Sequence, residues 1–188
     1  MIGPTLPGTI SQSRPSMTDL STLHRLLRTQ RTIAIVGLSA DWFRPSYFAA
    51  KYMLDHGYRV IPVNPKYPEI LGQKAYASLR DIPEPVDMVD VFRKTDDVLP
   101  IAREAIAIGA RTLWQQLGVL NHEADRLARE AGLDSVMDRC VKIEHGRLFG
   151  GLGWAGVNTG VISAKRPAWD GHMRSAPARP VTPDPSRS

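Results

Sequence analysis

Five short runs of β-branched and apolar residues, most of them separated by segments with helical spacing, constrain the fold of this 188-residue chain more than any other feature. The runs span residues 32–36, 58–63, 86–92, 111–115 and 133–137. Strands that alternate with helices of about ten residues form right-handed βαβ units with a mainly parallel sheet. The sequence therefore predicts an α/β fold, a Rossmann-like doubly wound sheet of five strands.

The order of the strands is predicted from how continuous each run is. Uninterrupted apolar runs are typical of central strands in parallel sheets. The third run carries Asp87 and Asp90, so we expect it at an edge and predict the order 3-2-1-4-5. Before the first strand, Ser16 and Asp19 have the spacing of a capping box, which predicts a helix through Leu20 to Leu27.

The composition of the two ends differs from that of the middle. Residues 1–16 have no continuous apolar block, and residues 166–188 are rich in proline and poor in apolar side chains, so both are predicted to be flexible. This leaves residues 17–165 as the folded domain. No apolar run approaches the ~20 residues of a membrane span, and no secretory or transit pattern is present. We therefore expect a cytoplasmic protein that does not enter a membrane.

Charge and cysteine content exclude several classes of function. The formal charge is +5, but one arginine in residues 1–16 and a net +2 after residue 165 leave only +2 for the middle, too little to favour nucleic-acid binding. A single cysteine, Cys140, rules out a disulfide framework or a Cys-rich zinc site. The five histidines lack metal-ligand spacing, and no Ser-His-Asp arrangement can be recovered, so neither a metal site nor a catalytic residue is predicted.

In doubly wound sheets, ligands bind beyond the carboxyl ends of the strands, so the loops there are the candidate site. After the first strand, Gly37 allows close approach of the backbone and Ser39 offers a hydroxyl and an amide. Pro45 and Ser46 then open a helix whose free amides suit a phosphate, and Arg44 adds a permanent positive charge beside them.

Two well-known chemistries do not fit this loop. A dinucleotide fingerprint needs glycine where Ser39 stands and an acid where Asn64 ends the second strand, so NAD is disfavoured. A nucleophile elbow needs glycine in place of Asp41. Pro65 makes Asn64 extended, and Lys66 follows it with a positive charge that suits a phosphorylated ribose, as in NADP or coenzyme A. A surface lysine in a turn explains Lys66 equally well.

The remaining strand ends add apolar and amide groups. Phe92 and Arg93 follow the third strand, where Phe92 offers an apolar face for an adenine or a pantetheine arm. Gln116 and Gly118 follow the fourth and offer amides without charge. Cys140 follows the fifth strand beside a cation, which favours a reactive thiolate, although a buried and inert cysteine is the simpler interpretation.

A set of motifs in this order and spacing resembles one family. The motifs are Ile35-Val36-Gly37-Leu38-Ser39, Arg44-Pro45-Ser46-Tyr47, residues 57–65, Leu71-Gly72, residues 86–93, Trp114-Gln115-Gln116-Leu117-Gly118 and Asp138-Arg139-Cys140. Together they are similar to the small bacterial CoA-binding proteins, relatives of the CoA-binding domain of succinyl-CoA synthetase α subunits. The resemblance covers residues 22–148 and implies a Rossmann-like domain that binds coenzyme A.

The resemblance also implies where coenzyme A would bind. Its contacts would fall on Gly37, Ser39, Arg44, Ser46, Asn64, Pro65, Lys66, Phe92, Arg93 and the loop of Gln116 and Gly118. The synthetase also needs a domain with a phosphorylated histidine, for which this sequence has no room after Leu148. We expect a stand-alone module that binds coenzyme A or an acyl-CoA without catalysis. The alternatives are an NADP-dependent oxidoreductase and the CoA-binding subunit of an acyl-CoA ligase completed by a separate chain.

Overall fold

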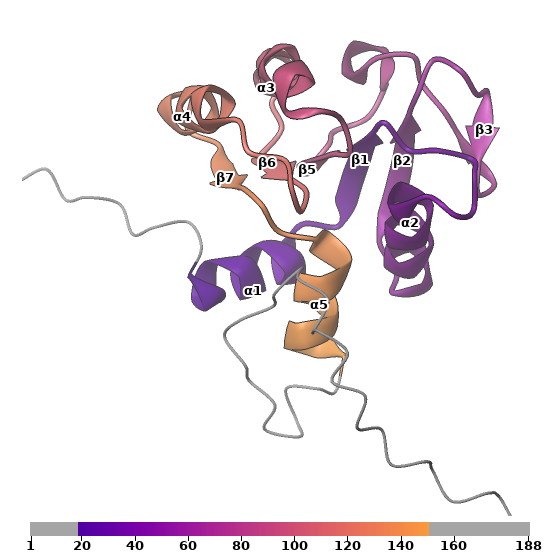
Figure 1. The fold of residues 1–188 in the computed structure, drawn as a ribbon, viewed down its shortest axis with the longest axis horizontal. Coiled ribbons are helices and arrows are strands. Elements are labelled where there is room, and N and C mark those ends of the chain that lie inside the picture. The colour runs from indigo at the N-terminus through magenta and orange to yellow at the C-terminus, as the bar shows by residue number, and fades with distance from the viewer. Residues whose placement is uncertain (1–18, 151–188) are drawn as a thin grey trace, which may run out of the picture. The chain divides into compact units, whose positions relative to one another are not determined.

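Five parallel strands form the centre of the computed structural model, which describes residues 19–150 (Figure 1). The strands are β1 (Thr32–Val36), β2 (Arg59–Val63), β5 (Met88–Val91), β6 (Thr112–Gln115) and β7 (Asp134–Val136). They pair in parallel throughout, in the order β2-β1-β5-β6-β7. The predicted fold class and the five-stranded parallel sheet are confirmed. The predicted extension, tail and outer boundary of the domain lie outside the described residues.

The predicted strand order is wrong at one strand. The third predicted strand, β5, lies in the middle of the sheet between β1 and β6 rather than at an edge, so the order in the predicted numbering is 2-1-3-4-5. Each of its two acids accepts hydrogen bonds there through one of its oxygen atoms. Asp87 Oδ2 accepts from the amides of Arg31 (2.9 Å) and Thr32 (3.0 Å), and Asp90 Oδ1 accepts from Gln116 Nε2 (2.7 Å). Buried polar groups with such partners are compatible with a central strand.

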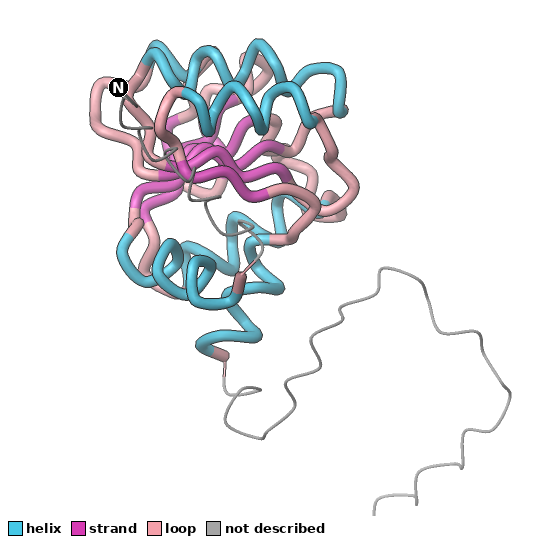
Figure 2. Tube along the Cα trace, turned by 90° about the vertical axis from the view of Figure 1, so that its left-hand side faces the viewer, coloured by secondary structure: helices cyan, strands magenta, loops and turns pink. Residues whose placement is uncertain are grey.

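Helices cover both faces of the sheet (Figure 2). The helices α1 (Leu20–Thr29), α2 (Pro45–Asp55) and α5 (Val141–Phe149) pack on one face, and α3 (Val98–Ala107) and α4 (His122–Glu130) on the other. Successive strand residues point to opposite faces. Ile33 and Ile35 therefore join the first layer of the core, and Ala34 joins the second. Among residues 19–150, no helix is long and apolar enough to cross a membrane.

The helix starts differ in how they are capped. Asn121 caps α4, since its side chain accepts from the amide of Ala124 at 2.8 Å. The helix α1 begins at Leu20, with Asp19 as its N-cap and no side-chain cap bond. The predicted capping residue Ser16 lies outside the described part. A 3₁₀ turn, η2 (Thr95–Asp97), precedes α3.

The connection from β2 to β5 was not predicted. It contains a hairpin of β3 (Glu69–Ile70) and β4 (Gln73–Lys74), followed by the 3₁₀ turn η1 (Leu79–Asp81). The hairpin turns at Leu71 and Gly72, which both have positive φ angles (54° and 70°), as a tight two-residue turn requires. This crossover carries no α-helix, and its residue Tyr76 forms a parallel bridge with Val63 at the end of β2.

Candidate functional site

The sheet reverses its winding direction between β1 and β5, and the candidate site lies at their carboxyl ends. The chain leaves β1 toward β2 on one side, whereas β5 leads to β6 and β7 on the other. Gly37 follows β1 with a φ of +85°, and a Cβ atom there would lie 2.6 Å from the carbonyl oxygen of Phe92. Only glycine fits this close approach. Such a reversal point is where open α/β sheets bind their ligands.

The loop from β1 to α2 is held by its own polar groups. The amide of Ser39 donates to Ser46 Oγ at 3.2 Å, and Ser39 Oγ accepts from the amide of Asp41 at 3.1 Å. Arg44 is the N-cap of α2 and Pro45 is its first residue, and no side chain caps this end of the helix. The first turn of α2, which lines the site through Pro45 and Ser46, therefore directs the positive end of the helix dipole toward it.

Asn64 joins the loops that follow β1 and β2. Its Nδ2 donates to the carbonyl of Leu38 at 2.8 Å, and its Oδ1 accepts from the amide of Lys66 at 3.0 Å. The side-chain amide thereby uses both its donor and its acceptor within the protein. Its role in the structure is to fix the loop that carries the exposed residues Pro65 and Lys66.

These residues line a polar pocket of about 460 Å³ at the reversal point. Its lining comprises Gly37, Ser39, Arg44, Pro45, Ser46, Asn64, Lys66, Tyr67, Phe92 and Arg93. A smaller adjoining pocket adds Pro65. Three cations meet here from three loops. Arg44 lies 3.6 Å from Asp41 and Arg93 lies 3.3 Å from Asp97, whereas Lys66 forms no ion pair with any residue in the range 19–150.

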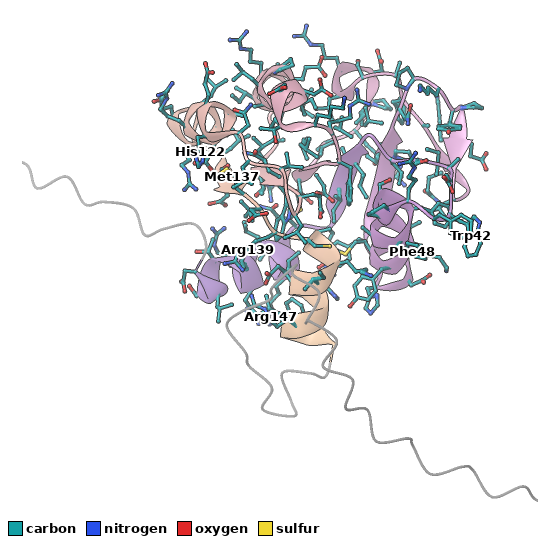
Figure 3. All side chains as sticks on the ribbon, viewed as in Figure 1. Trp42, Phe48, His122, Met137, Arg139 and Arg147 are labelled. Carbon is teal, nitrogen blue, oxygen red and sulfur yellow. The ribbon has the colours of Figure 1, made fainter. Side chains whose placement is uncertain are left out.

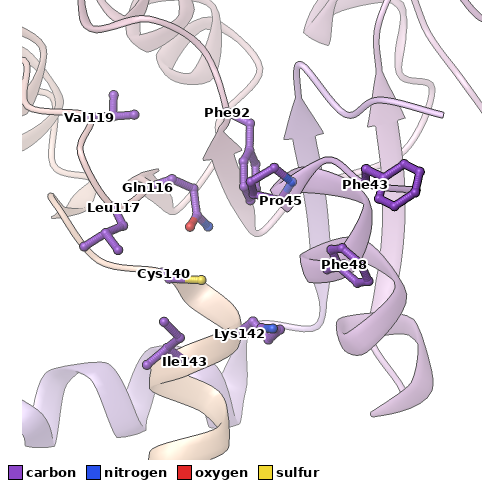
Figure 4. A pocket seen from close by; sticks show the side chains of 10 residues that line it. All are labelled: Phe43, Pro45, Phe48, Phe92, Gln116, Leu117, Val119, Cys140, Lys142 and Ile143. Carbon is purple, nitrogen blue, oxygen red and sulfur yellow. The ribbon is translucent and has the colours of Figure 1, made fainter. Parts of the chain in front are cut away.

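A second, apolar pocket of about 590 Å³ adjoins the polar one (Figure 4). Its lining comprises Phe43, Pro45, Phe48, Phe92, Gln116, Leu117, Val119, Cys140, Lys142 and Ile143. Pro45 and Phe92 line both pockets, so the two are neighbours across these side chains. Twelve of the thirteen predicted site residues therefore lie in the two pockets or in the small adjoining one.

Gly118 is the predicted site residue that lines none of these three pockets. Its φ is +82°, and its amide donates to Asp138 Oδ1 at 2.7 Å, so it serves the turn after β6. Trp114, one strand position before Gln115, is fully buried, and its Nε1 donates to the carbonyl of Arg139. Both residues support the loops that carry Gln116 and Cys140.

A buried acid lies behind Gln116 and was not predicted as part of the site. Asp90 is fully buried, and its Oδ2 has no hydrogen-bond partner among the described residues. Burial raises its pKa to about 8, although the hydrogen bond from Gln116 opposes this rise. The carboxyl group is thus mainly protonated at neutral pH. Its bond to Gln116 Nε2 fixes the side-chain amide of Gln116, which lines the apolar pocket.

Cys140 is the N-cap of α5, beside this buried acid. Burial raises the pKa of its thiol, and Asp90 would raise it further in its ionised form, while the amides of Ile143 and Lys142 act in the opposite direction. The expected activation of Cys140 by Arg139 is not observed, because the Arg139 guanidinium pairs with Glu144 at 2.9 Å. The thiol is therefore mainly protonated, as in the inert interpretation.

The exposed aromatic residues of the site were missed by sequence reasoning. Phe43 is 70% exposed and Phe48 is 46% exposed, and both line the apolar pocket. Trp42 is 59% exposed, and its ring is tilted by 40° against that of Phe43, with the ring centroids 4.0 Å apart. It lies on the same side of the molecule as Phe48 of α2 (Figure 3). The signal was available, since Trp42 and Phe43 are adjacent aromatics in a polar loop, a place where large apolar side chains are unusual.

Acids, histidines and Cys140 do not form a metal-binding cluster in the described part of the chain. The rings of His56, the C-cap residue of α2, and of His145 in α5 have centroids 5.0 Å apart. Burial lowers the pKa of His145, and the nearby charges of His56 and Arg31 lower it further. Neither histidine lines any of the three pockets.

This chain is similar to several known proteins. Residues 31–146 match the family described as CoA binding domain. The protein YneT of Bacillus subtilis is 40% identical over 123 residues, which cover 65% of this chain and 91% of YneT. A solved structure of a hypothetical protein from Pyrococcus horikoshii is 40% identical, with a TM-score of 0.70, over 75% of this chain and all of that one.

A more distant relative is an enzyme. The ADP-forming acetate–CoA ligase of Methanocaldococcus jannaschii is 34% identical over 58 residues, which cover 31% of this chain and 8% of that enzyme. The matched family extends from just before β1 to within α5, and so includes every strand of the parallel sheet and every loop that lines the pockets. This chain belongs to the family of CoA binding domains.

Proposed function

We propose that this chain binds coenzyme A or an acyl-CoA as a stand-alone module. The observation that carries the proposal is the meeting of the polar and apolar pockets at Phe92 and Pro45. Coenzyme A has the same division, because charged phosphates lie at one end and a largely uncharged pantetheine arm at the other. A ligand of this kind would bridge the two pockets.

The polar pocket supplies groups that suit the phosphates. Arg44, Lys66 and Arg93 provide positive charge from the loops after β1, β2 and β5. The first turn of α2 provides the positive end of the helix dipole. We assign the phosphorylated ribose to Lys66, because this pocket residue forms no ion pair with any other residue in the range 19–150 and its ammonium group would offset the phosphate.

The apolar pocket supplies groups that suit the pantetheine arm. Phe92 presents an apolar ring at the junction, and Gln116 presents a side-chain amide further in. Asp90 fixes Gln116 Nε2, which leaves Oε1 as an acceptor for an amide N–H of the ligand. We expect the thiol end of the arm to lie near Cys140 and the start of α5.

Calorimetry with coenzyme A, NADP and NAD tests the proposal. Coenzyme A should bind the most tightly, because the loop after β1 carries Ser39 where a dinucleotide fingerprint requires its second glycine. NADP shares the phosphorylated ribose and controls for simple phosphate attraction. Binding of NADP as tight as that of coenzyme A would contradict the proposal.

A second candidate is a ligase subunit that a separate chain completes. The similarity to part of an ADP-forming acetate–CoA ligase favours it. Affinity purification of the tagged full chain from its native cells, followed by an acyl-CoA ligase assay on the recovered complex, tests this candidate. Recovery of the chain alone, active in coenzyme A binding but without ligase activity, would favour the stand-alone module.

A further inference from the structure

The apolar pocket carries more hydrophobic surface than a pantetheine arm explains. Phe43, Phe48 and Leu117 are large apolar side chains that are 70%, 46% and 42% exposed, and all three face this one pocket. Soluble proteins seldom gather large exposed apolar groups in a hollow unless a ligand covers them. The pantetheine arm has two amides and a hydroxyl group, for which the pocket offers few polar partners.

The layout of the pocket separates these polar partners from an aliphatic end. In Figure 4, Phe92 and Pro45 stand at the junction with the polar pocket, and Gln116 follows. Leu117 and Val119 lie beyond Gln116, on the side away from Phe43 and Phe48. A ligand that enters over Phe92 would meet the amide of Gln116 first and aliphatic side chains afterwards.

The charge of the pocket limits what can occupy that end. Its lining has no acid and one cation, Lys142. The Cys140 thiol is mainly protonated, and the carboxyl group of Asp90 behind Gln116 is fully buried and mainly neutral. A carboxylate on the acyl group would lose its hydration among Leu117, Val119 and Ile143, and Lys142 alone would have to compensate for this loss.

We infer that the apolar pocket binds the uncharged aliphatic acyl chain of an acyl-CoA, with Leu117, Val119 and Ile143 around it. This inference rests on the proposed function, because it takes the phosphates of the same ligand to lie in the polar pocket. The chain therefore distinguishes acyl-CoA thioesters by the length and charge of their acyl groups.

Calorimetry on the full chain with coenzyme A and its acetyl, butyryl, hexanoyl and octanoyl thioesters tests this inference. Affinity should rise along the series, by at most about fourfold per methylene group that becomes buried. Succinyl-CoA is the matched control for butyryl-CoA, because its acyl group also has four carbons but ends in a carboxylate. Butyryl-CoA should bind more tightly of the two.

The outcomes separate this inference from the proposed function. Binding of coenzyme A with equal affinity for every thioester, or tighter binding of succinyl-CoA than of butyryl-CoA, overturns the acyl inference alone. No binding of coenzyme A or of any thioester overturns the proposed function and the inference with it.

Two leucines of one loop provide the matched variants. Leu117 and Leu120 are 42% and 43% exposed, but only Leu117 lines the pocket. Leu117→Ser should lower the ratio of octanoyl-CoA affinity to coenzyme A affinity several-fold, whereas Leu120→Ser should keep the ratio of the unmodified protein. Each ratio compares two ligands on the same variant, so a general loss of stability lowers both affinities alike and leaves the ratio unchanged. Equal ratios in the two variants would overturn the placement of the acyl chain.

Discussion

The polar and the apolar pocket share two side chains but are built in different ways. The polar pocket consists of loops that directly follow β1, β2 and β5, and its side chains are fixed by hydrogen bonds such as those of Asn64. The apolar pocket combines the start of α2, the loop after β6 and the start of α5, and much of its lining is exposed apolar surface. The difference shows that the arrangement of the strands and their loops provides the polar pocket, whereas individual exposed side chains provide the apolar pocket.

Gly37→Ala is expected to have the largest effect on stability and on coenzyme A affinity, because it changes the backbone that forms the polar pocket. The new Cβ would lie 2.6 Å from the carbonyl oxygen of Phe92 and would hold a left-handed φ of +85°. The strain and the overlap together should lower the free energy of unfolding by about 2 to 5 kcal/mol. Coenzyme A affinity should fall more than tenfold. Urea denaturation measures the change in stability, and calorimetry measures the change in affinity.

Gly132→Ala is the matched control for this variant. Gly132 has a similar φ of +88°, but a Cβ there meets no atom within 4 Å. It should lower the free energy of unfolding by only about 1 to 2 kcal/mol through strain. If the two variants lose the same stability, the close approach of β1 and β5 is not the reason for Gly37.

The second prediction concerns Asp90, the buried acid behind Gln116 of the apolar pocket. Burial raises the pKa of Asp90 to about 8 in the folded protein, whereas an unfolded aspartate has a pKa of about 3.9. The folded chain therefore keeps a proton that the unfolded chain has released, and stability should fall as pH rises from about 4 to about 8. Asp90→Asn should remove most of this fall, which amounts to at most about 5 kcal/mol.

Urea denaturation at pH 5, 6.5 and 8 measures this effect. Asp55→Asn serves as the control, because the Asp55 side chain is 57% exposed and pairs with Lys51 on the surface of α2. That variant should keep the pH dependence of the unmodified protein. An unchanged pH dependence in Asp90→Asn would show that the carboxyl group is ionised in the folded protein.

The smallest expected effect is the loss of one side-chain contact to a single phosphate group of coenzyme A. Lys66→Ala should weaken coenzyme A binding by about 1 to 3 kcal/mol, as expected for a hydrogen bond to a charged group. Dephospho-CoA, which lacks the 3′-phosphate, should lose little affinity. Lys94→Ala removes a nearby exposed lysine that lines none of the three pockets and controls for general charge. Equal losses for both ligands in Lys66→Ala would reject Lys66 as the partner of the 3′-phosphate.

The residues of the polar pocket could be predicted because their position depends on the strand that directly precedes them in the sequence. Each residue there directly follows a strand that has a clear apolar run, and the ends of parallel strands meet at one edge. Twelve of the thirteen predicted residues accordingly lie in the described pockets. Gly118 lines none of the three pockets and serves a turn, and a sequence does not distinguish a turn glycine from one that faces a ligand. Its contact with coenzyme A stays a prediction.

The sequence does not predict the position of a residue whose interactions involve a partner far away in the chain. Asp90 predicts an edge strand, but Gln116, 26 positions away, provides a hydrogen bond to it in a central strand. Part of the lining of the apolar pocket was missed for a related reason, because Leu117 and Ile143 resemble core residues in the sequence. The hairpin of β3 and β4 was missed since each strand has only two residues, too few for any periodicity.

The two ends of the β1–β5 pair fix the register between these strands. Asp87 binds the amides at the start of β1, and the amide of Phe92 donates to Val36 at the other end, 2.9 Å away. Insertion or deletion of one residue between them would turn Asp90 to the face covered by α3 and α4 and away from Gln116. The five-residue spacing from Asp87 to Phe92 is therefore a sharper criterion for finding proteins with this site than the identity of the apolar residues in between.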